Sequence, residues 1–150
     1  MTTHGRARVL ADDVNTDYII SSSRKRATID PKQLAPYLLE RASPEFAASV
    51  RPGDVLVAGR NFGCGSAMEV AVTVIQAAGI GAVVARSFAR SFFRNAFNNG
   101  LRAVECDTAS FHEGDTITIQ VSDGSDGEVR VHNETRNVTV AGASLPPIIQ

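Results

Sequence analysis

The chain has 150 residues, of which 43% are hydrophobic and 21% charged, and its formal net charge is −1. Such a chain buries about two thirds of its unfolded surface, which predicts a single compact domain over residues 1–150. The near-neutral charge, with no basic run interleaved with aromatics, argues against a nucleic-acid partner. No apolar stretch approaches the roughly 20 residues of a membrane span, and no signal-peptide pattern follows Met1, so we expect a cytoplasmic protein.

Few side chains in this chain could bind a metal ion. The two cysteines, Cys64 and Cys106, lie far apart in the sequence, which indicates reduced thiols and not a disulfide framework. Two thiols cannot supply the thiolates that normally hold an iron–sulfur cluster, and the three histidines show no zinc-ligand spacing. We therefore expect no metal site in this chain.

The first third of the chain predicts a strand, polar loops and short helices. In chain order, these elements are a strand at 6–10, a polar turn-rich loop at 12–17, an exposed basic loop at 21–28, a helix from 30 through 39 and a second helix start at 43–45. The strand is predicted from its alternating pattern, and the basic loop from its lack of any period. Asp30 and Pro31 are favourable residues for a helix N-cap and first turn.

The middle of the chain predicts an α/β arrangement. The expected elements are a strand at 54–58, a helix at 66–78, a strand at 82–85, a helix at 87–97 and a strand at 101–106. This order is typical of a parallel sheet with right-handed crossovers. Phe88, Phe92 and Phe93 fall on the inward face of the second helix, where core packing is their expected role.

The C-terminal part is rich in strands. Residues 116–121, 128–132 and 137–140 alternate with period two, and the turn-rich segment 122–127 separates the first two of these runs. The predicted fold class is therefore α/β, with a central parallel or mixed sheet, flanking helices and a β-rich C-terminal part. In such sheets, ligands usually bind at the carboxyl ends of the strands.

The most informative motif is the Gly-Cys-Gly-Ser turn at 63–66, between a predicted strand and a predicted helix. The glycines allow a sharp backbone path, and Ser66 falls where a helix start exposes unpaired N–H groups that favour anions. An exposed hydroxyl beside such groups suits a carboxylate substrate. Ser66 and Glu69 also form a capping-box pattern, and on spacing alone this structural role is the better explanation. The spacing matches no usual phosphate loop.

Several ordered blocks resemble one known family. They are Asn-Thr-Asp-Tyr-Ile-Ile at 15–20, Gly-Arg-Asn-Phe-Gly-Cys-Gly-Ser at 59–66, Ala-Arg-Ser-Phe-Ala-Arg at 85–90 and Arg-Asn-Ala-Phe-Asn-Asn-Gly-Leu at 94–101. Together they closely resemble the small subunit of 3-isopropylmalate dehydratase, which acts in leucine biosynthesis and is equivalent to the swivel domain of aconitase. The resemblance runs from about Val9 to the C-terminus and implies a swivelling β/β/α-type domain.

The resemblance also implies half of a hydro-lyase. Members of the family remove and add water on 2- or 3-hydroxy di- and tricarboxylic acids, using a [4Fe-4S] cluster bound by cysteines of a separate large subunit. The serine matching Ser66 is the alkoxide-like base that takes the carbon-bound proton, and the aspartate matching Asp17 belongs to the same catalytic site. We therefore expect this chain to bind no cluster, to form a heterodimer or heterotetramer with the large subunit, and to be inactive alone.

The chain departs from the family pattern where the substrate is bound. The family usually has Ser-Ser-Arg after Gly-Cys-Gly, and its second serine and arginine bind a substrate carboxylate, but Ala67 and Met68 stand at these positions. Losing such a contact should weaken the usual substrate's binding several-fold to thousands-fold. The basic run 24–26 offers a replacement: counted without gaps from Asp17, Arg26 matches the arginine of a family specificity loop. Alternatively, these cations only solvate the loop.

Three functions compete on these observations. The leading one is a hydro-lyase small subunit acting on a hydroxy-dicarboxylic acid of the isopropylmalate or substituted-malate kind. Its expected residues are Ser66 and Asp17 for catalysis, and Gly65, Ala67, Met68, Arg24 and Arg26 for binding the substrate. The second is a non-catalytic paralogue that serves as a binding or assembly subunit. The third is a free-standing domain that binds a small ligand or nucleic acid, which the neutral charge and the lack of a stacking surface disfavour.

Overall fold

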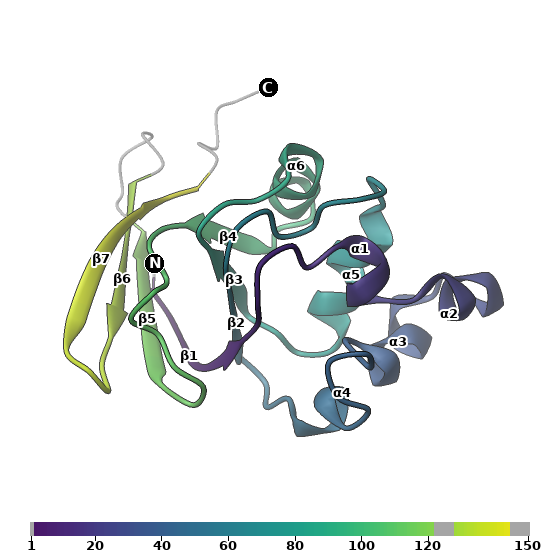
Figure 1. Ribbon diagram of the computed structural model, residues 1–150, viewed down its shortest axis with the longest axis horizontal. Helices are drawn as coiled ribbons and strands as arrows, with labels where there is room; N and C mark the ends of the chain where they lie inside the picture. Colours follow the sequence, from purple (N-terminus) through teal and green to yellow (C-terminus); the bar gives the residue numbers. More distant parts are fainter. Residues whose placement is uncertain (1, 122–127, 145–150) are drawn as a thin grey trace.

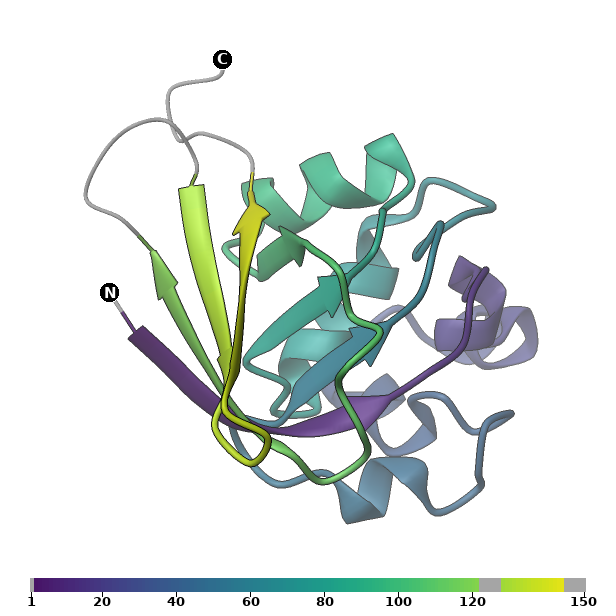
Figure 2. The same ribbon diagram turned by 60° about the vertical axis from the view of Figure 1, so that its left-hand side comes forward.

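In the computed structural model, which describes residues 2–121 and 128–144, seven strands close into a barrel (Figures 1 and 2). The strand order around the barrel is β1-β2-β3-β4-β7-β6-β5. The strands are β1 (Thr2–Val9), β2 (Val55–Ala58), β3 (Ala82–Ala85), β4 (Arg102–Glu105), β5 (Thr116–Val121), β6 (Glu128–Asn133) and β7 (Val138–Ala143).

The barrel combines a parallel half with an antiparallel half. Strands β1, β2, β3 and β4 pair with one another in parallel, in that order. Strands β5, β6 and β7 form antiparallel ladders with one another, and β5 also pairs with β1 in an antiparallel ladder. A single register pair, Glu105 with Ala143, joins β4 to β7 and closes the barrel. The predicted fold class, α/β with a mixed sheet and a β-rich C-terminal part, is confirmed. The closure was not predicted, because it depends on pairing between residues far apart in the chain.

The helices gather on the side of the barrel away from β5, β6 and β7 (Figure 1). They are α1 (Thr16–Ile19), α2 (Ser22–Ala27), α3 (Pro31–Leu34), the 3-10 helix η1 (Ala35–Tyr37), α4 (Phe46–Ser49), α5 (Glu69–Ala77) and α6 (Arg90–Asn98). Within residues 2–121 and 128–144, none of these helices has the length and apolarity that crossing a bilayer requires.

Successive side chains of the parallel strands point to opposite faces of the sheet, and they contribute to two separate hydrophobic cores. In β2, Val55 and Val57 point into the barrel and pack with Ile117 and Ile119 of β5. Leu56, between them, packs outward beneath the helices, in a second core that holds the buried faces of α5 and α6. Because both faces of these strands are covered, they appear in the sequence as continuous apolar runs. The three phenylalanines expected on the inward face of α6 or just before it are all in this second core.

The segment 21–28 is a helix, so the prediction of a loop was wrong. The Ser21 hydroxyl caps α2 by accepting from the N–H of Arg24, and three basic residues occupy its last turn, where a helix dipole favours cations. None of the residues of α2 is buried. The periodicity that normally reveals a helix was therefore missing, because a helix without a buried face needs no apolar stripe.

Two other helices are shorter than predicted. Asp30 caps α3 as expected, but the α-helix ends at Leu34 and continues as the 3-10 turn η1, which contains Pro36. A proline inside a helix removes one hydrogen bond and clashes with the preceding turn, which explains the break. Helix α5 begins at Glu69 instead of Ser66. The turn-rich segment predicted at 122–127 lies outside the described residues.

Candidate functional site

The loops that follow β1, β2 and β3 run side by side beyond the carboxyl ends of these strands. The amide of Thr16 donates to the carbonyl of Cys64 at 2.8 Å, and the amide of Gly63 donates to the carbonyl of Val14 at 2.7 Å. The amide of Phe62 likewise donates to the carbonyl of Ser87, at 3.0 Å. These bonds hold the turn at 63–66 against the start of α1, at the sheet edge where the sequence predicts a ligand site.

Two glycines shape the turn. Gly63 and Gly65 have φ values of +83° and +94°, a region that side-chain-bearing residues rarely adopt. A Cβ on Gly63 would also lie only 2.3 Å from Cγ of Phe92, so the turn fits tightly on the buried ring of α6. Gly65 packs against Thr16 with ordinary contacts. The backbone ahead of Ser66 therefore has one accessible path, which fixes the direction of that side chain.

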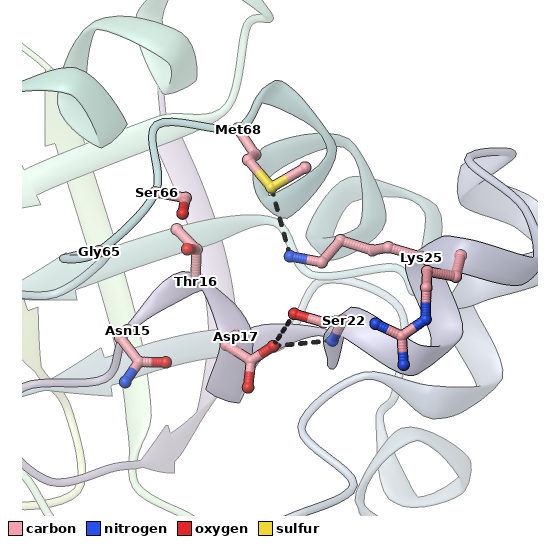
Figure 3. Close-up of a pocket in the computed structure, with 9 residues that line it drawn as sticks. Asn15, Thr16, Asp17, Ser22, Lys25, Gly65, Ser66 and Met68 are labelled. Atoms are coloured by element: carbon pink, nitrogen blue, oxygen red, sulfur yellow. Dashed lines mark hydrogen bonds between the residues drawn. The ribbon is translucent and has the colours of Figure 1, made fainter.

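A cavity of about 420 Å³ opens between this turn, α1 and α2 (Figure 3). Its volume is within the range of small-ligand sites. The residues that line it are Asn15, Thr16, Asp17, Ser22, Lys25, Arg26, Gly65, Ser66 and Met68. The lining thus brings together five of the seven predicted site residues, from three separate segments of the chain. It includes neither Arg24 nor Ala67 among the described residues.

Ser66 is exposed and belongs to the cavity wall, and in Figure 3 its hydroxyl points toward the side chain of Thr16. The N-cap of α5 is Met68, and no side chain caps this helix, so the capping-box explanation of Ser66 and Glu69 is wrong. Within the described part of the chain, the Ser66 hydroxyl has no hydrogen-bond partner. It is therefore free to interact with a ligand.

Asp17 is bound on both carboxylate oxygens. Its Oδ1 accepts from the N–H and the hydroxyl of Ser22, at 2.7 and 2.5 Å, and its Oδ2 lies 3.0 Å from Nη1 of Arg41. The hydrogen bonds from Ser22, together with the positive charges of Arg41 and Lys25, hold the pKa of Asp17 below its usual range. Asp17 is thus a carboxylate at neutral pH. It anchors the N-terminal end of α2 to α1.

The structure separates the three basic residues of α2. Arg24 points away from the cavity, where its guanidinium donates twice to the carboxylate of Glu40, each time at 3.1 Å, and lies 3.8 Å from the centre of the Tyr37 ring. The hydrogen bonds from Arg24 lower the pKa of Glu40. Lys25 and Arg26, by contrast, line the cavity. Sequence reasoning singled out Arg26 and Arg24 for the site, and only Arg26 is there.

The sequence reasoning missed several polar residues of the cavity wall. Lys25 reaches the site from α2, and its Nζ lies 3.3 Å from Sδ of Met68 (Figure 3). Asn15 caps α1 through its Oδ1, which accepts from the N–H of Tyr18 at 2.7 Å. The signal for Asn15 and Thr16 was present, because they belong to the same family block as Asp17. Lys25 belongs to the basic run 24–26 that the sequence pointed to, but it was not singled out there, because only a helical conformation at 22–27 directs it to the cavity.

The described residues do not fit a resident iron–sulfur cluster. Over residues 2–121 and 128–144, no group of three His, Cys, Asp or Glu side chains is arranged to hold a metal ion. Cys64 and Cys106 are free thiols. Burial, and to a smaller extent the charge of Asp107, raises the pKa of Cys106 to about 12, so this sulfur stays protonated and is a poor ligand.

Comparisons with known proteins agree on one family. The family model for the aconitase C-terminal domain matches residues 41–109. The 3-isopropylmalate dehydratase small subunit 1 of Methanopyrus kandleri is 50% identical over 122 residues, which cover 80% of this chain and 71% of that protein. The corresponding small subunit of Moorella thermoacetica is 43% identical over 152 residues, covering 100% of this chain and 88% of the relative. This chain belongs to the same small-subunit family.

A solved structure supports the family at the level of the fold. The crystal structure of 3-isopropylmalate dehydratase (leuD) from Methanocaldococcus jannaschii superimposes with a TM-score of 0.88 at 38% identity, covering 99% of this chain and 85% of that one. The resemblance inferred from the sequence blocks is thereby confirmed. As a member of this aconitase-superfamily family, the chain has the swivel-domain fold, and the turn at 63–66 lies within the segment that the family model matches.

Proposed function

We propose that this chain is the small subunit of a two-subunit hydro-lyase that dehydrates and rehydrates a hydroxy-dicarboxylic acid of the isopropylmalate or substituted-malate kind. The observation that carries the proposal is the cavity itself, which places around one space two cationic side chains and a serine hydroxyl that has no hydrogen-bond partner in the described residues. A diacid needs cations to bind its carboxylates, and a hydro-lyase needs a base for the carbon-bound proton. The names of the relatives, 3-isopropylmalate dehydratase small subunits, point to the same reaction.

In the proposed reaction, the ionised oxygen of Ser66 takes the proton from carbon and becomes a neutral hydroxyl. The electrons of the broken C–H bond form the carbon–carbon double bond, and the hydroxyl group on the neighbouring carbon leaves with its bonding pair as hydroxide. The hydroxide takes up the proton from Ser66 and departs as water, which restores the ionised serine. A serine hydroxyl is a weak base, so its anion needs positive charge nearby and exclusion of water. We assign Lys25 and Arg26 of this chain to the carboxylates of the substrate, and the positive charge beside Ser66 to the partner subunit. Hydration follows the same path in reverse.

Asp17 has a positioning role in this proposal. Both of its oxygens are occupied by Ser22 and Arg41, and its lowered pKa leaves it without a proton to give at neutral pH. It therefore holds α2 at the cavity and, through this helix, the cations of the site. The family resemblance implies a place for Asp17 in the catalytic site, whereas the geometry favours this indirect contribution.

We further propose that the site is completed by a separate large subunit, to which we assign the [4Fe-4S] cluster of the family. That cluster would act as a Lewis acid for the leaving hydroxyl. Ser66 is exposed on the isolated chain, so water reaches it freely and the base remains solvated. A covering partner would remove this water, which explains why we expect the chain alone to be inactive. The cytoplasmic location stays a prediction from the sequence.

The test is reconstitution with the large subunit, followed by hydration assays on a panel of unsaturated dicarboxylates. Ser66→Ala should lower kcat by about 10²- to 10⁴-fold, the range for loss of a general base. The matched control is Ser91→Ala, because Ser91 lies on α6 outside the cavity lining. This control should keep the wild-type rate and the wild-type melting temperature.

Two outcomes would contradict the proposal in different ways. Equal activity of the wild type and Ser66→Ala would remove this hydroxyl from the mechanism and leave the enzyme class intact. Failure of the reconstituted wild type to act on any diacid, while it still binds its large subunit, would favour the alternative of a non-catalytic paralogue that serves as an assembly subunit.

A further inference from the structure

Two cations at the cavity are left without an acidic partner. Of the four basic residues in or next to its wall, Arg24 and Arg41 are each bound to a carboxylate. Lys25 and Arg26 both line the cavity, and among the described residues no carboxylate lies within ion-pair distance of either. Lys25 is half-buried. The charge of Lys25 also acts on Asp17, but both oxygens of that carboxylate are already taken by Ser22 and Arg41. A half-buried cation with no carboxylate at ion-pair distance is a favourable place for an anionic ligand, because the cost of removing it from water is already partly met.

The neighbour that Lys25 has is uncharged. Its Nζ donates to Sδ of Met68 at 3.3 Å, and both side chains are half-buried. A thioether is a weak acceptor and carries no charge, so the contact orients the ammonium without neutralising it. A lysine ammonium has three N–H donors, and two of them remain for a ligand. Met68 thus holds the charge of Lys25 at the cavity wall.

We propose that Lys25 binds one carboxylate of the substrate, and that Met68 both orients the ammonium and forms the apolar wall beside it. This inference rests on the proposed function, since it takes the substrate to be a hydroxy-diacid. Lys25 and Arg26 are neighbours on a helix and project about 100° apart, so each can take a separate carboxylate. The pair selects a diacid with a small apolar substituent, which Met68 contacts.

Lys25→Met in the reconstituted enzyme tests the role of the charge, because methionine keeps an unbranched chain of similar width. KM for the diacid should rise by about 10- to 100-fold, with kcat changed less than about threefold, as expected for loss of a charge-assisted contact. Lys32→Met is the matched control, because Lys32 is exposed on α3 outside the lining. It should leave both constants unchanged. Lys25→Arg should recover most of the binding, and Met68→Leu should give a smaller rise in KM.

Inhibition by a saturated diacid shows which group Lys25 binds. Methylsuccinate and its two monoamides are compared as competitive inhibitors of the wild type and of Lys25→Met. The wild type should prefer the diacid to each monoamide, and in Lys25→Met this preference should disappear for one of the two, because the lost cation and the lost carboxylate are partners.

The outcomes separate this inference from the proposed function. A wild-type enzyme that turns over a diacid, combined with an unchanged KM and unchanged monoamide preferences in Lys25→Met, would overturn the role of Lys25 and leave the proposed function standing. A wild type that turns over no diacid would overturn both. If Lys25→Met lost its melting transition, the decision would rest on Met68→Leu, where a wild-type KM would also overturn the inference.

Discussion

Asp115, at the start of β5, and Lys25, on α2, are both charged groups, but their surroundings differ. The side chain of Asp115 is 4% exposed, and its Oδ2 accepts from Nδ2 of Asn133 at 2.7 Å and from Nε of Arg136 at 2.8 Å. Among the described residues, the one hydrogen-bond contact of the Lys25 ammonium is the thioether of Met68, and no carboxylate lies at ion-pair distance from it. A buried charge with all its partners in place stabilises a fold, whereas a charge left without one is available to a ligand.

The two regions also differ in what holds their backbones in place. Strands β5, β6 and β7 are held by long antiparallel ladders. Helices α1 and α2 contain four and six residues, too few to be stable alone, and they depend on side chains such as Asn15, Ser21 and Asp17 at their ends. The barrel therefore provides the rigid frame, and the site is assembled on short segments that capping residues hold in place. Four substitutions test this contrast.

The largest effect is expected where the site turn meets the core. Gly63→Ala would force a Cβ to within 2.3 Å of Cγ of Phe92 and place alanine in a left-handed conformation. The two costs, strain and overpacking, should together lower the free energy of unfolding by about 2 to 5 kcal/mol. Denaturant unfolding measures this change.

Gly100→Ala is the control for the turn substitution. Gly100 has a φ of +76°, and no atom lies within 4 Å of the position that a Cβ would take, so this variant carries the strain without the clash. It should cost about 1 to 2 kcal/mol. Equal losses in the two variants would show that the contact with Phe92 does not constrain the turn.

On the barrel side, Asp115→Asn should lower stability by about 2 kcal/mol at neutral pH. Burial alone would raise the pKa of Asp115, but hydrogen bonds from Asn133, the amide of His112 and Arg136 outweigh it and lower the pKa from 3.8 to about 2. The unfolded chain therefore binds more protons between these values. The contribution of Asp115 is complete above about pH 4 and is lost as the pH falls to about 2.

Unfolding measured between pH 2 and pH 6 checks the role of Asp115. The variant should show a weaker loss of stability on acidification than the wild type. Asp107→Asn is the control, because Asp107 is exposed and asparagine keeps the oxygen that accepts from the amide of Ala109. If Asp107→Asn and Asp115→Asn reduced the loss of stability at low pH by the same amount, the buried network around Asp115 would not be the source of that loss.

On the site side, Asp17→Asn should raise KM by about tenfold, with kcat within about threefold of the wild type, because α2 loses its charged anchor. Ser22→Ala should also raise KM. The double variant should raise KM little further, since both substitutions weaken the same contact between Asp17 and Ser22. Asp13→Asn is the control outside the lining. A large fall in kcat with an unchanged KM would instead identify Asp17 as a catalytic residue.

The smallest effect is expected at Arg24. Its ion pair with Glu40 is partly exposed, so Arg24→Met should cost less than about 1 kcal/mol and leave KM within about twofold. Arg26→Met, two positions further along α2 and inside the lining, should raise KM by about tenfold. Steady-state kinetics on the reconstituted enzyme compare the two. A tenfold rise in KM for both variants would mean that Arg24 leaves Glu40 and enters the cavity when substrate binds, and an unchanged KM for both would remove Arg26 from the binding site.

Much of the fold could be predicted from local patterns. The strands β2, β3 and β4 and the helices α5 and α6 follow from apolar runs, helical spacing and glycine stops, because each of these elements buries apolar side chains in the core. Helix α2 could not be found in this way, since it buries no residue and is held by the Ser21 cap and an ion pair. The capping box at Ser66 failed for a related reason: the bonds of the 63–66 turn to neighbouring loops delay the helix start to Glu69.

Residue types at fixed spacings along the chain were enough to identify the family and the α/β class, and to predict Asp17, Ser66 and Arg26 as site residues. Three-dimensional packing was needed to show that the barrel closes, that Asp17 is occupied by Ser22 and Arg41, and that Lys25 reaches the cavity while Arg24 does not. These outcomes depend on which distant residues meet. Neighbouring side chains on one exposed helix point in different directions, and the surrounding structure alone shows which of them faces the cavity.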